Sequence, residues 1–417
     1  MSSADEAIPA RREPFFYGWV IVAAGFCAQV ISSLSMQGLA TYATPLRAEF
    51  GWSLGQTALG RSIQTADTLL GPLSGLLVDR LGARWMMVAG TLVYLLGFAV
   101  MARVHSLAGF YLACLLMGIA NSLLGLLVVS QMINAWFTHR RSAAMGLAVA
   151  GFAVSGFVVL PLIVWAQAQF GWRATAMGTG IGIVLIGLPV MLMVRSTPEE
   201  MGLHPLGASP QAGRAAALTG PTLGQALRGR GFWMLTGAMS LAGMHQSALM
   251  VHFFPYVEAT DSRVMAGIVI AVVNLFNLAG RLGGGLLGDL MPKSRFLALG
   301  GLAAGLGLAL MAGLSGLLPA LIFAMVFGFS WGSRTAVSSA LTGELFGRRA
   351  FGRIAGLSQT IVTLATIASP LAFGALVDAG LGYPLLFAGL AVCTLASSAL
   401  FFALPAGQSA GQAAGHP

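Results

Sequence analysis

The sequence predicts an all-α membrane protein with twelve transmembrane helices in two pseudo-symmetric six-helix bundles. The first observation is composition: hydrophobic residues make up 57% of the 417-residue chain and charged residues 8%, with a mean hydropathy of +0.83. A soluble domain carries about 25% charged residues. The second is a repeat, because Gly-Leu-Leu-Val-Asp at 75–79 recurs as Gly-Leu-Leu-Gly-Asp at 285–289, an offset of 210 positions. This offset is close to half the chain and indicates a duplicated bundle.

Twelve apolar stretches follow one another along the chain, each of about 20 residues, which is the length that a helix needs to cross the hydrocarbon core of a bilayer. The chain holds 56 glycines, which allow membrane helices to approach one another closely. We expect the spans at residues 17–40, 54–78, 86–103, 108–134, 143–168, 174–194, 232–256, 264–287, 296–313, 317–342, 354–378 and 383–404.

The hydrophobic pattern lapses between the sixth and seventh spans, where Pro198, Pro205, Pro210 and Pro221 oppose a continuous helix. Most Lys and Arg fall in the loops on one side, which the positive-inside rule places in the cytoplasm. We therefore expect a multi-pass protein of the plasma (inner) membrane with both termini cytoplasmic. The predicted divisions are an N-terminal tail, an N-terminal bundle, a cytoplasmic linker, a C-terminal bundle and a C-terminal tail, at residues 1–16, 17–194, 195–231, 232–404 and 405–417.

Several other classes of protein lack support. The basic residues are dispersed over many loops, so we expect no nucleic-acid partner. Cys27, Cys114 and Cys393 are scattered singly inside predicted spans and have no metal or disulfide spacing. The glycines at 283, 285 and 288 fit a dinucleotide fingerprint, but they lie in an apolar helix with no preceding strand. We expect no enzyme activity, no catalytic residues, no cofactor and no metal site.

One motif resembles a known family. Residues 75–84, with Gly75, Asp79, Arg80, Gly82 and Arg84, are similar to the loop signature between helices 2 and 3 of the major facilitator superfamily. Segments at 17–20, 136–137, 198–203, 252–256 and 280–281 resemble the monocarboxylate and oxalate/formate branch of that superfamily. The resemblance implies a carrier that exposes a central site alternately to each side of the membrane.

The same resemblance implies a gate on the cytoplasmic side. In the superfamily the acid of this motif pairs with a helix terminus and the basic residues pair with neighbouring charges when that side is closed. We interpret Asp79, Arg80 and Arg84, with Asp289 of the second copy, as gating residues. The second copy is degenerate, because Leu290 stands where the first copy has Arg80.

Arg281 is the first candidate for substrate binding. A guanidinium keeps its charge, so inside a membrane it needs a partner, a watery cavity or an anionic ligand. Asn274, Asn277 and Arg281 share one face of the eighth predicted span. The resembled branch binds a substrate carboxylate through an Arg in helix 8 with an Asn one turn earlier, which Asn277 and Arg281 match. The alternative is that Arg281 only caps carbonyl groups near the cytoplasmic end.

Arg334 is the second intramembrane cation, in the tenth predicted span. Oxalate-type carriers hold the second carboxylate with a Lys in helix 11. Here that helix offers Gln359, Thr363 and Thr366 instead, so we expect Arg334 to take this role or else to form an ion pair or pack between helices. Trp331, three residues earlier, is expected to form an aromatic wall of the cavity or simply to pack.

Three residues are candidates for proton coupling or charge balance. An offset of 210 places Asp67 opposite Asn277, so pseudo-symmetry turns Asp67 toward the same cavity. A membrane carboxylate either neutralises an Arg or takes a proton. The alternative for Asp67 is a structural ion pair. His245 and His252 share one face of helix 7, and histidine is the residue type suited to relaying protons, but a satisfied interfacial role is the alternative for His252.

The sequence thus predicts a secondary active transporter for a small organic anion, either a monocarboxylate or a short dicarboxylate, by proton symport or anion exchange. The expected partners are the small carboxylate, protons or a counter-anion, and the lipid bilayer, and the expected functional unit is a monomer. Two alternatives stay open. One is a proton-coupled exporter of drugs or amphiphiles with the same fold, for which Arg281 would be dispensable. The other is a nontransporting membrane receptor.

Overall fold

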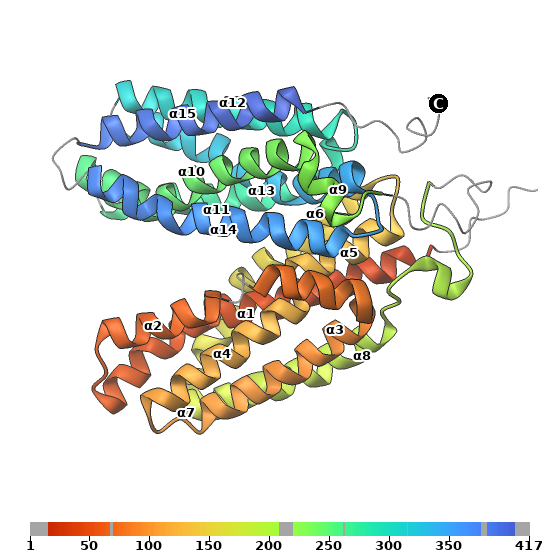
Figure 1. Cartoon of the computed structure of the whole chain (residues 1–417). Coiled ribbons are helices and arrows are strands. Elements are labelled where there is room, and N and C mark those ends of the chain that lie inside the picture. The colour runs from red at the N-terminus through yellow and green to blue at the C-terminus, as the bar shows by residue number, and fades with distance from the viewer. Residues whose placement is uncertain are drawn as a thin grey trace, which may run out of the picture.

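The computed structural model describes residues 16–66, 70–207, 220–261, 263–314, 316–376 and 382–404, and helices account for nearly all of this part of the chain (Figure 1). The one isolated β-bridge in these ranges joins Phe137 to Leu206. The helices are α1 (Gly18–Phe50), α2 (Leu54–Thr65), α3 (Gly71–Ala102), α4 (Leu107–Leu124), α5 (Leu126–Trp136), α6 (Arg141–Val154), α7 (Leu160–Gly182), α8 (Leu188–Met193), α9 (Leu223–Arg228), α10 (Arg230–Thr260), α11 (Arg263–Leu287), α12 (Lys293–Gly313), α13 (Leu317–Phe346), α14 (Phe351–Leu376) and α15 (Gly382–Ala403). Short π-helical turns at Ser155–Val159 and Ile183–Gly187 connect α6 to α7 and α7 to α8.

Nine helical segments of the described chain are long and apolar enough to cross a membrane. Two of them hold more than one crossing, because Gly82 in α3 and Gly171 in α7 each have φ 78° and interrupt the helix. Only glycine adopts this backbone conformation readily. The seventh crossing is α10 (Arg230–Thr260). With these breaks counted, the described helices follow the predicted order of twelve crossings in an integral, multi-pass membrane protein.

The second predicted span, 54–78, is divided in the structure. The helix α2 ends at Thr65, and α3 begins at Gly71 with Pro72 in its first turn. A proline is tolerated in a first turn because its missing N–H has no partner there, whereas it disrupts a helix interior. Asp67, the acid predicted for proton coupling, lies outside the described residues.

The helices form two halves, one from α1–α8 and the other from α9–α15 (Figure 1). Each half has its own hydrophobic core. Trp136 and Phe98 lie in the core of the first half, while the second half has separate clusters around Phe323 and around Phe232. In Figure 1 the halves lie close together at the end where α5, α6 and α9 meet, and they lie further apart at the opposite end, where α2 lies.

Glycines bring the two halves into backbone contact. A Cβ atom on Gly75 of α3 would overlap the backbone of Gly352 in α14, and one on Gly285 of α11 would lie 2.6 Å from the carbonyl oxygen of Ser142 in α6. These contacts are related by the sequence repeat, since both the glycine and its partner shift by 210 positions. Small residues are the usual means by which membrane helices pack this closely. The duplicated motif therefore marks the interface between the halves.

Candidate functional site

A central cavity of about 430 Å³ lies between the two halves. The first half lines it with residues of α3, α4 and α5, and the second half with residues of α10, α13 and α14. Hydroxyl and amide groups dominate its polar surface. The polar lining residues are Ser74, Asn121, Ser122, Ser130, Gln246, Arg334, Thr335, Ser338, Ser339, Thr342, Ser358, Gln359, Thr363 and Thr366.

Arg334 carries the only formal charge among the described residues that line this cavity. Its side chain projects from the middle of α13, where Nη2 donates a hydrogen bond to Oε1 of Gln246 in α10. Trp331 lines the same cavity from one turn earlier and stacks on Phe327, with ring centroids 6.0 Å apart. The structure therefore brings Arg334 and Trp331 together, and it adds Gln246 as a direct partner of the cation.

Arg281 lies elsewhere. Its side chain is 7% exposed and packs where α11 meets α6 of the first half. Nε donates to Oδ1 of Asn277 at 3.0 Å, Nη1 donates to the carbonyl oxygen of Val149 at 2.7 Å, and the guanidinium lies 5.3 Å from the ring of Phe152. In this conformation Arg281 thus bridges the two halves rather than lining the central cavity.

Asn274 and Asn277, which share a helix face with Arg281, are also absent from the described lining of the cavity. Asn277 is buried, and its Nδ2 has no hydrogen-bond partner in the described structure. Asn274 is exposed. Asn277 and Arg281 are therefore directed at the helix interface while Asn274 is not, and the grouping of Arg281 with Arg334 around one ligand is not present in this conformation.

Of the two predicted histidines, His245 lies near the cavity. It is buried in α10 beside Phe327, with ring centroids 5.9 Å apart, and it lines a second, smaller pocket that Arg334 also lines. His252, two turns further along α10, is partly exposed and lines neither of these pockets.

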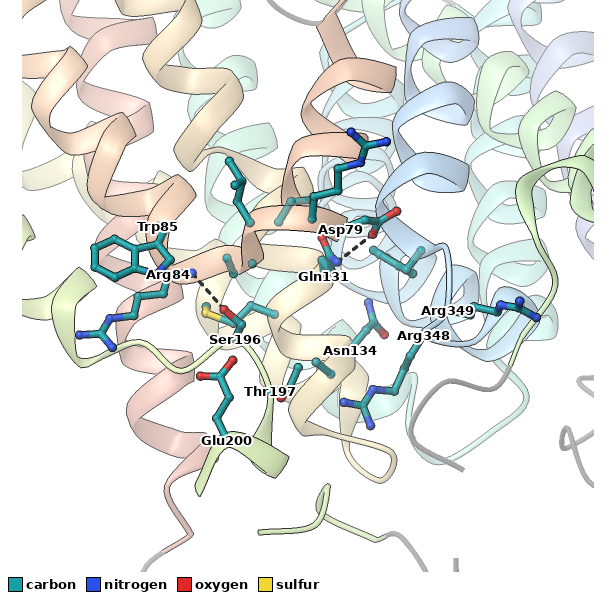
Figure 2. A pocket seen from close by; sticks show the side chains of 18 of the residues that line it. Asp79, Arg84, Trp85, Gln131, Asn134, Ser196, Thr197, Glu200, Arg348 and Arg349 are labelled. Atoms are coloured by element: carbon teal, nitrogen blue, oxygen red, sulfur yellow. Dashed lines mark hydrogen bonds between the residues drawn. The ribbon is translucent and has the colours of Figure 1, made fainter. Parts of the chain in front are cut away.

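At the end where the halves meet, Asp79 joins α3 to α14 (Figure 2). Its carboxylate accepts hydrogen bonds from the backbone N–H groups of Gly352 at 3.1 Å and Arg353 at 3.3 Å. It also accepts one from Nε of Arg353 at 3.1 Å and one from Nε2 of Gln131 at 3.0 Å. The three contacts with Gly352 and Arg353 place the acid at the positive N-terminus of α14.

Asp289 makes the equivalent contact in the other direction. Its carboxylate accepts the backbone N–H groups of Ser142 at 3.1 Å and Ala143 at 2.9 Å, at the N-terminus of α6. Lys293 lies 3.6 Å from the same carboxylate and 2.6 Å from Glu344. Both predicted gating acids therefore cap a helix of the opposite half.

The motif arginines behave differently from the acids. Arg80 is exposed, and Arg84 lies over the ring of Trp85 at 5.3 Å. Figure 2 shows Arg84 directed away from Asp79. Among the described ion pairs of this face, the cations are Lys293, Arg348 and Arg353 rather than these two.

A further ion pair ties the loop before α14 to the start of the linker. Nη1 and Nη2 of Arg348 donate to the two carboxylate oxygens of Glu199 at 2.9 and 3.1 Å, a bidentate geometry. Partial burial alone would raise the pKa of Glu199, but the hydrogen bonds from Arg348 outweigh it, and the pKa is lowered. Asp79, Asp289 and this ion pair all connect parts of the molecule at the same end, which we call the linker face.

Sequence reasoning missed some residues of the site. Gln246 follows His245 directly, and its role as the partner of Arg334 depends on how α10 meets α13. Asn121 in α4 lines the cavity at the position that the offset of 210 matches with Trp331, so the repeat itself could have identified it. The Glu199–Arg348 pair lacks any such signal, because the two residues lie in connections between the α-helices, 149 positions apart.

The protein has two related helical bundles with a polar cavity between them, and hydrogen bonds and ion pairs join the bundles at one end. This is the architecture of membrane transporters that are built from repeats. The chain belongs to the Major Facilitator Superfamily, whose sequence profile matches residues 25–333. This confirms the fold and family that the sequence predicts.

Relatives of known name point to one branch of the superfamily. Monocarboxylate transporter 13 of Rattus norvegicus is 25% identical over 398 residues, covering 93% of this chain and 89% of the relative. Monocarboxylate transporter 11 of Mus musculus is 27% identical, covering 73% and 67%. The fujikurins efflux protein of Gibberella fujikuroi is 26% identical, covering 54% and 46%. The chain therefore resembles the monocarboxylate branch.

Solved structures show the same fold. The fucose:proton symporter of E. coli superposes with a TM-score of 0.73 at 14% identity, covering 93% of this chain and 98% of that one. A proton:xylose symporter of the same superfamily gives a TM-score of 0.71, also at 14% identity, covering 93% and 96%. At this identity the likeness concerns the fold alone.

Proposed function

We propose that the protein is a secondary active transporter that moves a small organic anion by alternating access, with the central cavity as its binding site and Arg334 as the group that holds the anion. The observation that carries this proposal is the charge of the cavity. Its described lining has one cation, no carboxylate and many hydroxyl and amide groups. An anion compensates such a site, whereas a lipophilic cation would meet only repulsion from Arg334.

The chemistry of Arg334 suits a carboxylate. A guanidinium donates two parallel hydrogen bonds to the two oxygens of a carboxylate, and such charge-assisted pairs are about twice as strong as neutral ones. In the structure, the neutral side-chain oxygen of Gln246 accepts a hydrogen bond from one of these N–H groups of Arg334. A carboxylate that displaced this oxygen would gain charge compensation, while Gln359 and Thr363 offer donors from the facing helix α14.

The size of the cavity leaves the substrate class open to monocarboxylates and short dicarboxylates. A volume of about 430 Å³ lies within the range of small-molecule sites, which is about 300–1,000 Å³. The names of the monocarboxylate relatives support a carboxylate as the ligand. The efflux relative covers about half of this chain and makes export of a larger compound the outcome to test against.

Transport of an anion requires charge compensation. Uptake of one negative charge against an inside-negative potential costs about 2.3 kcal/mol per 100 mV. Proton symport or exchange for another anion removes this cost, so we infer one of these modes. Closure at the linker face, held by Asp79 and Asp289, corresponds in this proposal to a closed cytoplasmic side in a plasma membrane.

The test is binding by the purified full-length protein, followed as thermal stabilisation, since a ligand that binds the folded state raises its apparent stability. The panel contains formate, lactate, pyruvate, oxalate, larger carboxylates, neutral amides and lipophilic cations. We expect one carboxylate class to stabilise the protein, and Arg334→Gln to weaken its affinity about 10- to 100-fold through loss of a charged hydrogen bond. Arg103→Gln, an exposed arginine outside the cavity, is the matched control and keeps the affinity.

Two results would contradict the proposal. Stabilisation by lipophilic cations and by no carboxylate would favour the exporter. Equal carboxylate affinity in Arg334→Gln and in the parent would remove Arg334 from the site.

A further inference from the structure

His245 is a buried titratable group with an unused ring nitrogen. The residue is 6% exposed, Nδ1 forms no hydrogen bond of regular geometry among the described residues, and the backbone of Leu241, one turn earlier, is a polar group beside the ring. A buried polar atom without a regular hydrogen bond is unfavourable, so native structures seldom hold one without a reason. The position of His245 suggests that reason.

The ring borders a pocket of about 20 Å³ inside the second half, separate from the central cavity. This volume exceeds the roughly 10–15 Å³ that one water molecule requires. Its lining combines apolar residues such as Phe296 and Phe401 with the hydroxyl side chains of Ser330, Ser333, Thr394 and Ser397. The pocket therefore has room for one water molecule beside the imidazole and polar groups that such a water could contact.

Arg334 lines both this pocket and the central cavity. The guanidinium thus stands between the proposed anion site and the imidazole of His245. It is also the only charged group facing the pocket in the described structure, because the residues that α12 and α15 contribute there, such as Phe296 and Thr394, are uncharged and α14 contributes none.

Because Arg334 and His245 line the same pocket, the charge of one affects the charge that the other can carry. A proton on His245 places a second positive charge beside Arg334 in a region away from bulk water, where like charges repel strongly. An anion bound to Arg334 from the cavity side cancels one of the two charges. The protonated imidazole then faces a neutral pair instead of a lone cation.

We propose that His245 is the proton-carrying group of this transporter, and that binding of the anion at Arg334 draws one proton onto its imidazole. This inference rests on the proposed function and selects proton symport over exchange. Because binding linkage is reciprocal, protonation of His245 must strengthen anion binding by the same factor, and such couplings typically amount to about 5- to 150-fold. One anion and one proton then cross together without net charge.

The experiment is calorimetric titration of the full-length protein with the carboxylate that binds it, at several pH values and in buffers of different ionisation enthalpy. The buffer dependence reports the protons taken up per bound anion. We expect the parent to take up about one proton per bound anion at most. We also expect its affinity for the anion to be at least 5-fold higher at the acidic end of the pH range. We expect His245→Gln to bind with no proton uptake and with an affinity that does not change with pH.

Other variants separate the possible failures. His204→Gln, an exposed histidine of the linker, is the matched control and keeps the proton uptake. If His245→Gln does not bind, His245→Asn replaces it. Retained proton uptake in either His245 variant overturns the inference, as does loss of uptake in Asp67→Asn or His252→Gln instead.

The outcome for the parent distinguishes this inference from the proposed function. Anion binding without proton uptake overturns the role of His245 and leaves the anion transporter in place. No binding of any carboxylate by the parent, or unchanged binding in Arg334→Gln, overturns both.

Discussion

Asp79 and Asp289 make the same contact in opposite directions between the two halves. Asp79 of α3 accepts the first backbone N–H groups of α14, and Asp289, at the end of α11, accepts those of α6. The two acids are 210 positions apart, and so are the residues whose backbone N–H groups they accept. Because both contacts cross between the halves at the linker face, opening of that face must break both. We infer that the two acids stabilise the closed state together.

The first prediction concerns this pair of acids. Asp79→Asn removes the negative charge from the N-terminus of α14 and the ion pair with Arg353, whose carboxylate-to-Nε distance is 3.1 Å. Hydrogen bonds to a charged group contribute about 1.5–3 kcal/mol, so the ratio of closed to open states should fall by about 10-fold or more. Labelling of single cysteines placed at the linker face, after replacement of the three native cysteines, measures this ratio.

Asp289→Asn should give a shift in the same direction, because it removes the equivalent cap of α6. Arg80→Gln is the control at this face, since Arg80 is exposed and contributes no ion pair in the described structure. Labelling that is as slow in both aspartate variants as in the parent would refute the gating role of the acids.

The second prediction concerns the glycine contact beside Asp79. In Gly75→Ala the added Cβ would overlap backbone atoms of Gly352, and backbone cannot move aside as a flexible side chain can. The halves should therefore fail to close fully at the linker face, with faster cysteine labelling there and a lower Tm. Gly178→Ala in α7 is the matched control, because no atom lies within 4 Å of its new Cβ.

Gly178→Ala should leave the Tm unchanged or raise it slightly, because alanine favours a helix over glycine by about 0.5–1 kcal/mol. If Gly75→Ala behaves like Gly178→Ala in both measurements, close approach at Gly75 has no part in closure.

Much of the fold could be predicted from the sequence, because few kinds of structure can span a membrane. Long apolar segments must be helices, and a repeat at half the chain length implies two related bundles. The break before Pro72 was missed, because hydropathy continues through it while hydrogen bonding does not. The helix caps by Asp79 and Asp289 followed from the family motif, but their exchange between halves depends on contacts that lie far apart in the sequence.

The candidate site was harder to predict. The spacing of Asn274, Asn277 and Arg281 predicts one helix face, yet spacing alone does not say what that face meets. In the structure Gly146 allows α6 to approach the backbone of Arg281 so closely that the guanidinium reaches Val149 instead of the cavity. Arg334 faces the cavity because α13 turns its opposite face, with Gly332, toward α11.

The third prediction separates the two intramembrane arginines. Arg281→Gln removes the hydrogen bond to the carbonyl oxygen of Val149 and leaves the lining of the cavity intact. We expect the affinity for the carboxylate to change less than about 5-fold, against 10- to 100-fold for Arg334→Gln, as measured by titration of the purified variants. The loss of the hydrogen bond between the halves should appear instead as a change in the cysteine-labelling ratio at the linker face.

A loss of affinity in Arg281→Gln as large as that in Arg334→Gln would show that Arg281 contacts the anion at some stage of binding. Arg281→Lys then distinguishes a requirement for charge from a requirement for the guanidinium, because lysine cannot form the bidentate pair.

The last prediction is a pH dependence of the closed linker face. The pKa of Glu199 is lowered by its hydrogen bonds with Arg348, so the folded, closed state favours the ionised carboxylate. This ion pair contributes fully to closure above the ordinary pKa of Glu, which is about 4.3. Its contribution is lost as the pH falls through the lowered pKa of Glu199. At neutral pH, Glu199→Gln should therefore label faster at the linker face than the parent does.

As the pH falls below that lowered value, the parent and Glu199→Gln should converge, because the carboxylate of the parent becomes neutral as well. Glu200→Gln is the matched control: its carboxylate neighbours Glu199 but is exposed and makes none of the described ion pairs, so its labelling should follow the parent at every pH. Combining Glu199→Gln with Arg348→Gln should add little to either change alone, since both remove one interaction. A double variant whose effect equals the sum of the two single effects would show that the residues act independently, and it would exclude the pair as a fastening of the linker face.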